Sequence, residues 1–485
     1  MWERLDRAHA LRRASSRPAT GPDLLPRPDL PEGTELLPQI RHIVVLMMEN
    51  HSYDNYLGML AGRGEGFPLD RAGKPAVSNP DAEGNPVPAY PMPGPAQQEN
   101  VPSQSWHATH LQWNDGKLDG FVTGNLAVFP DRDPRVGMGY WTEQSLPFYY
   151  GLARTFPLAD RWFCSCLGPT FPNRRFLIAG TADGLIDDSP FNLLDYPATG
   201  TIFDLLTRHG ISWVNYHPLA RDQPSLGPYR RYARYRRRMA RRRLHSWLQG
   251  VRGVPDNVQK DMQFTADIFP LGIARYMAHI RTMDDFFAAA DGGTLPAFSI
   301  VDPDFTNYSE ENPQDITKGE SFAAEVIQRV LHGKGWEHTL LIWLYDEHGG
   351  YYDHVPPPPA VPPDDVPARS VLTQPTLLHR ILRRVLPGMV QDAEILDDGP
   401  RTYDRLGFRV PAVIVSPYAR RDFVLSQVLD HTSVLKLVEQ KWNLPPLTRR
   451  DAAAISPLAA LDLDGPPGFL VPPSLPEPTR KWGTW

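Results

Sequence analysis

Two continuous apolar runs, each ending abruptly at polar residues, constrain the fold of this 485-residue chain more than any other feature. They are Ile43–Met48 (IVVLMM) and Thr339–Tyr345 (TLLIWLY), and shorter runs recur at Ala297–Val301 and Pro411–Ser416. These runs lack the alternation of a strand with one face in water, and they are typical of strands buried on both faces. The sequence therefore predicts a central sheet that is covered on both sides.

Helical patterns lie between these runs, at Ile202–His209, Glu320–Leu331 and Ser433–Trp442. Buried strands that alternate with helices favour an α/β fold with a mostly parallel central sheet sandwiched by helices. In folds of this kind, ligands bind where the strands end and the loops begin. We therefore expect the functional residues to follow the apolar runs directly.

Changes in amino-acid composition along the sequence divide the chain into three parts. Residues 1–40 are rich in Arg and Pro and predict an N-terminal tail or surface strap, 41–455 form the expected catalytic domain, and 456–485 form a C-terminal tail. Two insertions are expected, at about 220–265 and 356–409. The 52 prolines gather in connections, which indicates long, stiff loops.

Each insertion has a distinctive composition. The first contains the arginine-rich stretch Tyr229–Leu244, and the second contains a proline-rich loop at Pro356–Pro367. In the second, Leu377–Leu386 also predicts a helix with leucines on one face and arginines on the other. Such a basic amphipathic helix fits peripheral contact with an anionic membrane, or it packs its leucines on the core.

Bulk composition excludes several classes of protein. A formal net charge of −6 gives no global reason to expect nucleic acid as a partner. The two cysteines, Cys164 and Cys166, are too close in sequence for an ordinary structural disulfide. No apolar run reaches the length of a transmembrane helix. Arg12 and Arg13 precede a polar stretch rather than an apolar one, so we expect no export signal and a cytoplasmic location.

Carboxylates and an amide follow the two longest apolar runs. Glu49 and Asn50 come directly after the first run, and Asp346 and Glu347 come directly after the second, before a Gly-Gly turn. Crowded carboxylates repel each other unless a cation compensates them. Their oxygens suit Mg, Ca or Mn better than Zn. An ordinary polar turn is the alternative at Glu49 and Asn50.

Thr170 lies in Gly168–Arg174 (GPTFPNR), between prolines that restrict the backbone. A threonine hydroxyl becomes a useful nucleophile when a metal or a base lowers its pKa. Arg174 follows four positions later and could grip a phosphate oxygen or orient the turn instead. Thr170 could also be the N-cap of a helix, and such a helix start would supply amides that bind anions.

Histidines at His110, His354 and His431 form a further set of candidates. A single histidine is more often a packed or surface residue than a catalyst. Phosphoryl transfer nevertheless needs an acid for the leaving oxygen, and histidine can fill that role near neutral pH.

Together these motifs resemble the phosphoesterase family that contains bacterial phospholipases C and acid phosphatases, within the alkaline phosphatase superfamily. The similar stretches include HIVVLMMENHSYDNYLG, SWHATHLQWNDGKLDGFV, LYDEHGGYYDHVPPP and VPAVIVSPYAR, and they follow the family's order from Arg41 to about Arg450. The sequence departs from the family pattern at Gln104 and Asn312, where many members have histidine. Both departures bear on substrate and pH optimum more than on the class of reaction.

The resemblance implies an alkaline-phosphatase-like fold and a metal-dependent hydrolase of phosphate esters. It implies that Thr170 attacks phosphorus to give a phosphothreonine and that the histidines surround the phosphate. The implied ligands of the divalent metal ion are Glu49, Asn50, Asp346 and Glu347. The substrate would be a phosphate ester, with a phospholipid among the candidates.

Two other functions fit parts of the pattern. Sulfatases of the same superfamily carry their nucleophile in C/S-x-P-x-R, and Thr170-Phe171-Pro172-Asn173-Arg174 has that spacing. Threonine, however, is not a precursor of the formylglycine that sulfatases need. A non-catalytic protein that binds membranes or anions on the same scaffold would be expected to lack the nucleophile or the carboxylates, and this chain has both.

Overall fold

A six-stranded sheet forms the centre of the computed structural model, which describes residues 24–98, 102–188, 196–217, 265–269, 276–305, 307–369 and 402–483. The strand order is β10-β9-β1-β8-β6-β7. The strands are β1 (His42–Met48), β6 (Trp213–Tyr216), β7 (Ile280–Arg281), β8 (Phe298–Val301), β9 (Thr339–Tyr345) and β10 (Ala412–Val415). All neighbours pair in parallel except β10, which runs antiparallel to β9. The mostly parallel sheet predicted from the sequence is confirmed.

The apolar character of the strands is explained by their burial. In β9 all seven residues are buried, and in β1 only the first is partly exposed. A strand with helices on both faces needs apolar side chains in both directions, because neither direction leads to water. The short strand β6 (WVNY) was not predicted, since Asn215 interrupts its apolar pattern.

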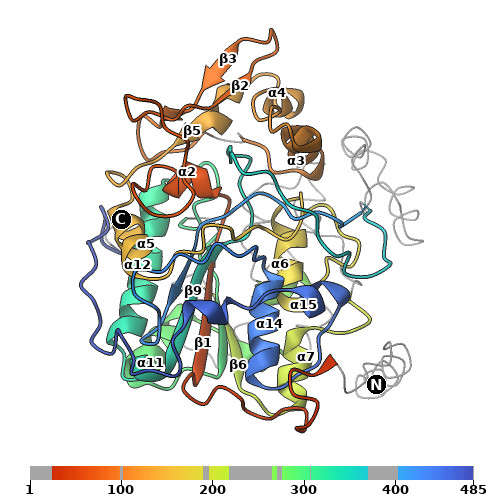
Figure 1. The fold of residues 1–485 in the computed structure, drawn as a ribbon, viewed down its shortest axis with the longest axis vertical. Helices are drawn as coiled ribbons and strands as arrows, with labels where there is room; N and C mark the ends of the chain where they lie inside the picture. Colours follow the sequence, from red (N-terminus) through yellow and green to blue (C-terminus); the bar gives the residue numbers. More distant parts are fainter. Residues whose placement is uncertain are drawn as a thin grey trace, which may run out of the picture.

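Helices cover both faces of the sheet (Figure 1). One group packs together on one side: α5 (Pro147–Thr155), α11 (Met283–Gly292) and α12 (Ile316–His332). The other side holds α6 (Thr170–Ala179), α7 (Ile202–Arg208), α14 (Thr432–Lys441) and α15 (Arg449–Ala453). The helices predicted at Ile202–His209, Glu320–Leu331 and Ser433–Trp442 correspond to α7, α12 and α14.

A smaller lobe lies at one end of the molecule, at the top of Figure 1. It includes the strands β2 (Ser78–Pro80) and β3 (Pro86–Pro88) and the helices α3 (Trp106–Trp113) and α4 (Thr123–Val128). Two short strands pair in parallel, β4 (Tyr90–Pro91) and β5 (Gly139–Tyr140), and the short helix α2 (Tyr53–Leu57) lies between this lobe and the sheet. The lobe therefore lies over the end of the sheet where β1 and β9 finish.

The two segments expected as tails lie against the domain where the structure describes them. Leu36 donates its amide to the carbonyl of Lys441, and Arg27 donates its amide to the side chain of Asn443. Near the other end of the chain, Phe469 and Leu475 are buried. The arginine-rich stretch Tyr229–Leu244 and the helix expected at Leu377–Leu386 lie outside the described residues.

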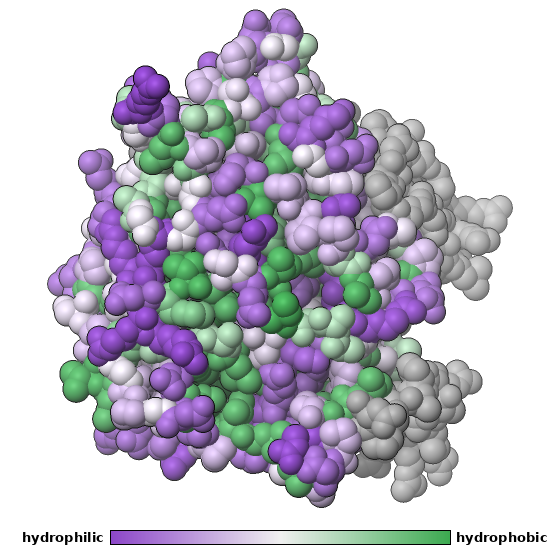
Figure 2. Space-filling view, viewed as in Figure 1, coloured by the Kyte–Doolittle hydropathy of each residue, from purple (hydrophilic) through white to green (hydrophobic). Residues whose placement is uncertain are grey.

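The surface shown in Figure 2 is largely hydrophilic, with hydrophobic residues gathered near its middle. Among the described helices, none combines the length and the apolar composition that a membrane span requires.

Candidate active site

The ends of β1 and β9 lie side by side and bring two sequence motifs together. Met48 pairs with Tyr345 at the last position of the parallel ladder, so Glu49 and Asp346 leave the sheet at the same edge. The amide of Asn50 donates to Asp346 Oδ1 at 3.2 Å. Asn50 and Asp346 are nearly 300 positions apart in the sequence. They meet because the parallel pairing of β1 and β9 ends both strands at the same level.

The backbone at Asn50 is left-handed and lies very close to the loop that carries Gly349. Asn50 has a φ of 70°, a left-handed conformation that asparagine tolerates better than most residues. A Cβ on Gly349 would lie 1.8 Å from the carbonyl oxygen of Asn50. The first glycine of the Gly-Gly turn is therefore required because the two loops approach so closely.

Thr170 begins helix α6, and its hydroxyl faces Asn50. Thr170 Oγ1 donates to Asn50 Oδ1 at 3.4 Å, and Thr170 is 5% exposed. Pro169, at the N-cap, provides no side-chain hydrogen bond to the helix. Instead, Asp188 Oδ1 accepts from the amide of Phe171 at 2.7 Å. Burial raises the pKa of Asp188 to about 8. Sequence reasoning missed Asp188, because no motif marks it.

Arg174 binds the carboxylates beneath the strand ends. Its Nε donates to Asp346 Oδ2 at 2.9 Å, and its Nη1 donates to Asp302 Oδ1 at 2.8 Å. Its Nη2 donates to the carbonyl of Met48 at 3.2 Å. All three nitrogens of this buried guanidinium therefore have protein acceptors, so Arg174 orients Asp346 in this structure. Asp302 was also absent from the predicted site.

Two of the four predicted metal ligands each have a buried carboxylate oxygen with no hydrogen-bond partner among the described residues, namely Glu49 Oε2 and Glu347 Oε1. Burial and then the charges of nearby Glu311 and Asp346 raise the pKa of Glu49 well above its usual value. Burial, followed by the charge of Asp346, does the same for Glu347. Such crowding fits a bound cation, which would compensate the carboxylates.

The ligands implied by the family resemblance thus have the chemistry of a site for a hard cation, with three carboxylates and one amide oxygen. Among these ligand oxygens, Asn50 Oδ1 accepts the hydrogen bond from Thr170. Within the described part of the chain, no three His, Cys, Asp or Glu side chains converge closely enough to hold one ion in this structure. Glu49, Asn50, Asp346 and Glu347 are all buried.

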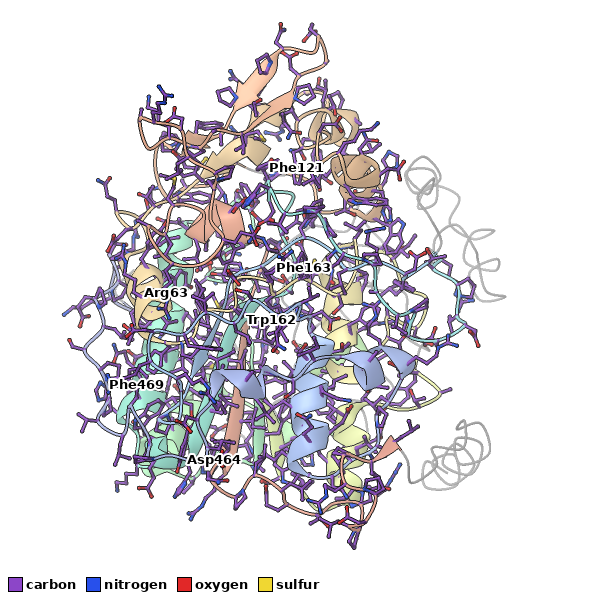
Figure 3. The ribbon with its side chains drawn as sticks, viewed as in Figure 1. Arg63, Phe121, Trp162, Phe163, Asp464 and Phe469 are labelled. Carbon is purple, nitrogen blue, oxygen red and sulfur yellow. The ribbon has the colours of Figure 1, made fainter. Side chains whose placement is uncertain are left out.

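The three predicted histidines lie in different surroundings. His431 is fully buried, donates from Nε2 to the carbonyl of Asp346 at 2.6 Å, and accepts from Trp162 Nε1 at 3.4 Å. Trp162 is labelled near the centre of Figure 3. Since both ring nitrogens of His431 have partners, this histidine positions the loop that carries Asp346.

His354 belongs to a separate ionic cluster. Its Nδ1 donates to Asp54 Oδ2 at 2.6 Å, and Arg409 binds both Asp54 and Asp353. Burial by itself would lower the pKa of His354, but the hydrogen bond and charge of Asp54 outweigh it, and the pKa is raised.

His110, on α3, donates from Nδ1 to the carbonyl of Trp106 at 2.7 Å. Burial lowers the pKa of His110 to about 4. The ring of Trp106 in turn lies against the loop that leads to Thr170, since a Cβ on Gly168 would be 3.0 Å from it. The structure therefore brings the α3 segment next to the loop of the predicted nucleophile.

Comparison with known proteins agrees with this architecture. The model of the Phosphoesterase family matches residues 40–445. Phospholipase C B of Mycobacterium tuberculosis is 30% identical over 437 residues, which cover 84% of this chain and 74% of the relative. Hemolytic phospholipase C of Pseudomonas aeruginosa is 27% identical and is matched over 86% of this chain and 54% of its own length.

A plant protein is similar as well. Non-specific phospholipase C6 of Arabidopsis thaliana is 26% identical, over 86% of this chain and 71% of the relative. Among solved structures, an alkaline phosphatase superfamily protein from Vibrio parahaemolyticus aligns with a TM-score of 0.34 and 12% identity, over 91% of this chain and 77% of that one.

The family match and the bacterial phospholipase C relatives define a hydrolase that acts on phosphoric ester bonds. The chain belongs to the Phosphoesterase family.

Proposed function

We propose that this chain cleaves phosphate esters as a phospholipase C does, with Thr170 as its covalent nucleophile. The observation that carries the proposal is the buried hydroxyl of Thr170 at the start of α6, 3.4 Å from Asn50 Oδ1 and beside two strand ends rich in carboxylates. The printed names of the relatives, phospholipases C from bacteria and a plant, support a phospholipid or a related ester as substrate.

In the proposed reaction, the Thr170 hydroxyl gives up its proton to solvent, Oγ1 forms a bond to phosphorus, and the bond from phosphorus to the alcohol oxygen breaks. The alcohol leaves with a proton, and water then hydrolyses the phosphothreonine. We assign the protonation of the alcohol to the predicted histidines as a group. Burial opposes protonation of His354, but the hydrogen bond and charge of Asp54 raise its pKa, whereas burial lowers the pKa of His110 to about 4. Arg174 holds Asp346 in position.

Glu49, Asn50, Asp346 and Glu347 would hold the divalent cation, which would supply positive charge to activate the hydroxyl and to stabilise the transition state. The two buried oxygens without partners, Glu49 Oε2 and Glu347 Oε1, support this assignment. Protein treated with EDTA and supplied with one ion at a time should regain activity with Mg²⁺, Ca²⁺ or Mn²⁺ in preference to Zn²⁺. Full activity of the metal-free protein would refute the metal assignment.

Covalent trapping tests the nucleophile. Wild-type protein quenched in acid during turnover of an aryl phosphate should carry one phosphate on the peptide that contains Thr170, as measured by mass spectrometry. Thr170→Ala should lose the label and the activity, and Thr170→Ser should keep part of both. Thr155→Ala, on helix α5, is the control and should behave as wild type. A labelled and active Thr170→Ala protein would overturn the assignment.

The choice between a lipid and a soluble ester needs a separate measurement. A phosphocholine lipid in vesicles and a simple monoester should be compared as substrates of the same preparation. Faster turnover of the lipid supports the phospholipase C function, and turnover of the monoester alone supports an acid phosphatase instead. Co-sedimentation with anionic vesicles at low salt tests peripheral membrane contact.

A further inference from the structure

A buried hydrogen bond links the small lobe to the turn that carries Glu347. His348 directly follows Glu347, and its Nε2 lies 2.7 Å from Oε1 of Gln112, on helix α3. On the other side of the ring, His348 Nδ1 lies 3.2 Å from Glu347 Oε2 but has no hydrogen-bond partner among the described residues. Gln112 and His348 are both buried, although neither was a predicted site residue.

The hydrogen bonds of Gln112 determine which ring nitrogen of His348 carries the proton. Its Nε2 donates to the carbonyl of Ser103 at 2.8 Å, so its Oε1 is left to act as an acceptor. His348 Nε2 must then carry the proton that it donates to Gln112. The ring also contacts Phe408 and Phe121, with ring centroids 4.5 and 6.3 Å away. Phe121 is labelled where the lobe meets the rest of the molecule in Figure 3.

Glu347 is consequently held at one of its two oxygens. Oε2 accepts from the amide of Gly349 at 2.7 Å, and Gly349 directly follows His348, whose ring is anchored by Gln112. Oε1 has no hydrogen-bond partner among the described residues. Because the hydrogen bond on Oε2 limits rotation of the carboxylate, it also fixes the direction in which Oε1 points.

We propose that Gln112 is a positioning residue for Glu347: it anchors the ring of His348, and so fixes the turn from Glu347 to Gly349 and the direction of Oε1. The inference rests on the proposed role of Glu347 as a metal ligand. Residues that orient a metal ligand typically change metal affinity by about 10- to 100-fold when they are replaced. The link would make the α3 lobe part of the metal site although it supplies no ligand.

Direct titration of the metal-free protein with Mn²⁺ by calorimetry tests the link. Gln112→Met keeps the length of the side chain but removes the acceptor, and it should weaken Mn²⁺ binding by about 10-fold or more. Asn79→Leu is the matched control in the same lobe. Asn79 is a buried amide that donates to Leu118 and accepts from Phe121 at 2.8 Å each. The Asn79→Leu variant should have a lower free energy of unfolding but an unchanged affinity for Mn²⁺.

A second variant covers the case in which Gln112→Met does not fold. His348→Phe keeps the aromatic packing and should weaken Mn²⁺ binding to a similar extent. The double variant should bind no more weakly than His348→Phe alone, because both changes break one link. Equal affinity in wild type and His348→Phe, or equal losses in Gln112→Met and Asn79→Leu, would overturn the inference.

Glu347→Gln separates this inference from the proposed function. If Glu347→Gln loses Mn²⁺ binding while His348→Phe binds normally, the metal role stands and the link is wrong. If Glu347→Gln binds Mn²⁺ as the wild type does, the metal role of Glu347 is wrong, and the link falls with it.

Discussion

The hydroxyl of Thr170 donates a hydrogen bond of 3.4 Å to the side-chain oxygen of Asn50, 120 residues earlier in the chain. Thr170 starts a helix and Asn50 follows a strand, so the contact joins two elements of different layers. A second bond, from the Asn50 amide to Asp346, extends the arrangement to the neighbouring strand. Asn50 is therefore the residue through which the predicted nucleophile meets the carboxylates.

Replacement of Asn50 should separate its backbone role from its side-chain role. Asn50→Gly accommodates the φ of 70° and removes the amide oxygen, so we expect near-normal stability and at least about a 10-fold loss of turnover. Asn50→Ala should lose the same activity and also about 1 kcal/mol of stability, because alanine is strained there. Thermal unfolding and aryl phosphate turnover check both. An Asn50→Gly protein with full activity would contradict the proposed role.

Arg174 should contribute strongly to stability through the charges that it compensates. Arg174→Met leaves Asp302 and Asp346 buried without their partner, and we expect a loss of about 3–5 kcal/mol. Adding Asp302→Asn should recover part of that loss, because one uncompensated charge disappears. Chemical denaturation of the single and double variants measures the effect. A double variant less stable than Arg174→Met would show that charge is not the cause.

His354 should make stability depend on pH. Its folded-state pKa lies above the unfolded value near 6.5, so the extra stability is fully present below that pH. The contribution is lost as the pH rises through the folded-state pKa. His354→Gln should therefore be less stable than wild type at pH 5.5, and the difference should shrink toward pH 9. Unfolding free energies across this range are the test, and a constant difference would contradict it.

Glu310 should also make the stability of the protein fall as the pH rises, but the cause is burial rather than an ion pair. It is buried among three tyrosine hydroxyls, from Tyr56, Tyr149 and Tyr345, and burial raises its pKa to about 8. Because the folded-state pKa exceeds the unfolded value, stability falls as the pH rises from about 4.5 to about 8.

Glu310→Gln should remove up to about 1.4 kcal/mol per pH unit from that slope. Glu320, also buried with a pKa raised to about 8, remains in the variant and contributes its own slope. Denaturation of wild type and variant at several pH values between 5 and 8 measures the difference. Identical slopes would show that Glu310 is ionised in the folded protein throughout this range.

Much of the fold could be predicted because buried strands impose a simple pattern. The β9 range is the one predicted, and β1 extends the predicted run by one residue. The antiparallel direction of β10 was not visible, because an apolar run reads the same in either direction. Strand β6 was missed because Asn215, whose side chain donates to Asp302 at 2.8 Å, breaks its pattern.

The amino-acid pattern shows where the strands end and which polar residues follow them. Burial on both faces demands continuous apolar runs, and the first polar residue after each run marks an edge of the sheet. It therefore located Glu49, Asn50, Asp346 and Glu347 as a group. The partners of these residues are set by the folding of the whole chain. Arg174, Asp302 and His431 meet them through contacts that no local spacing encodes, because strand order and helix packing set which distant residues share one buried volume.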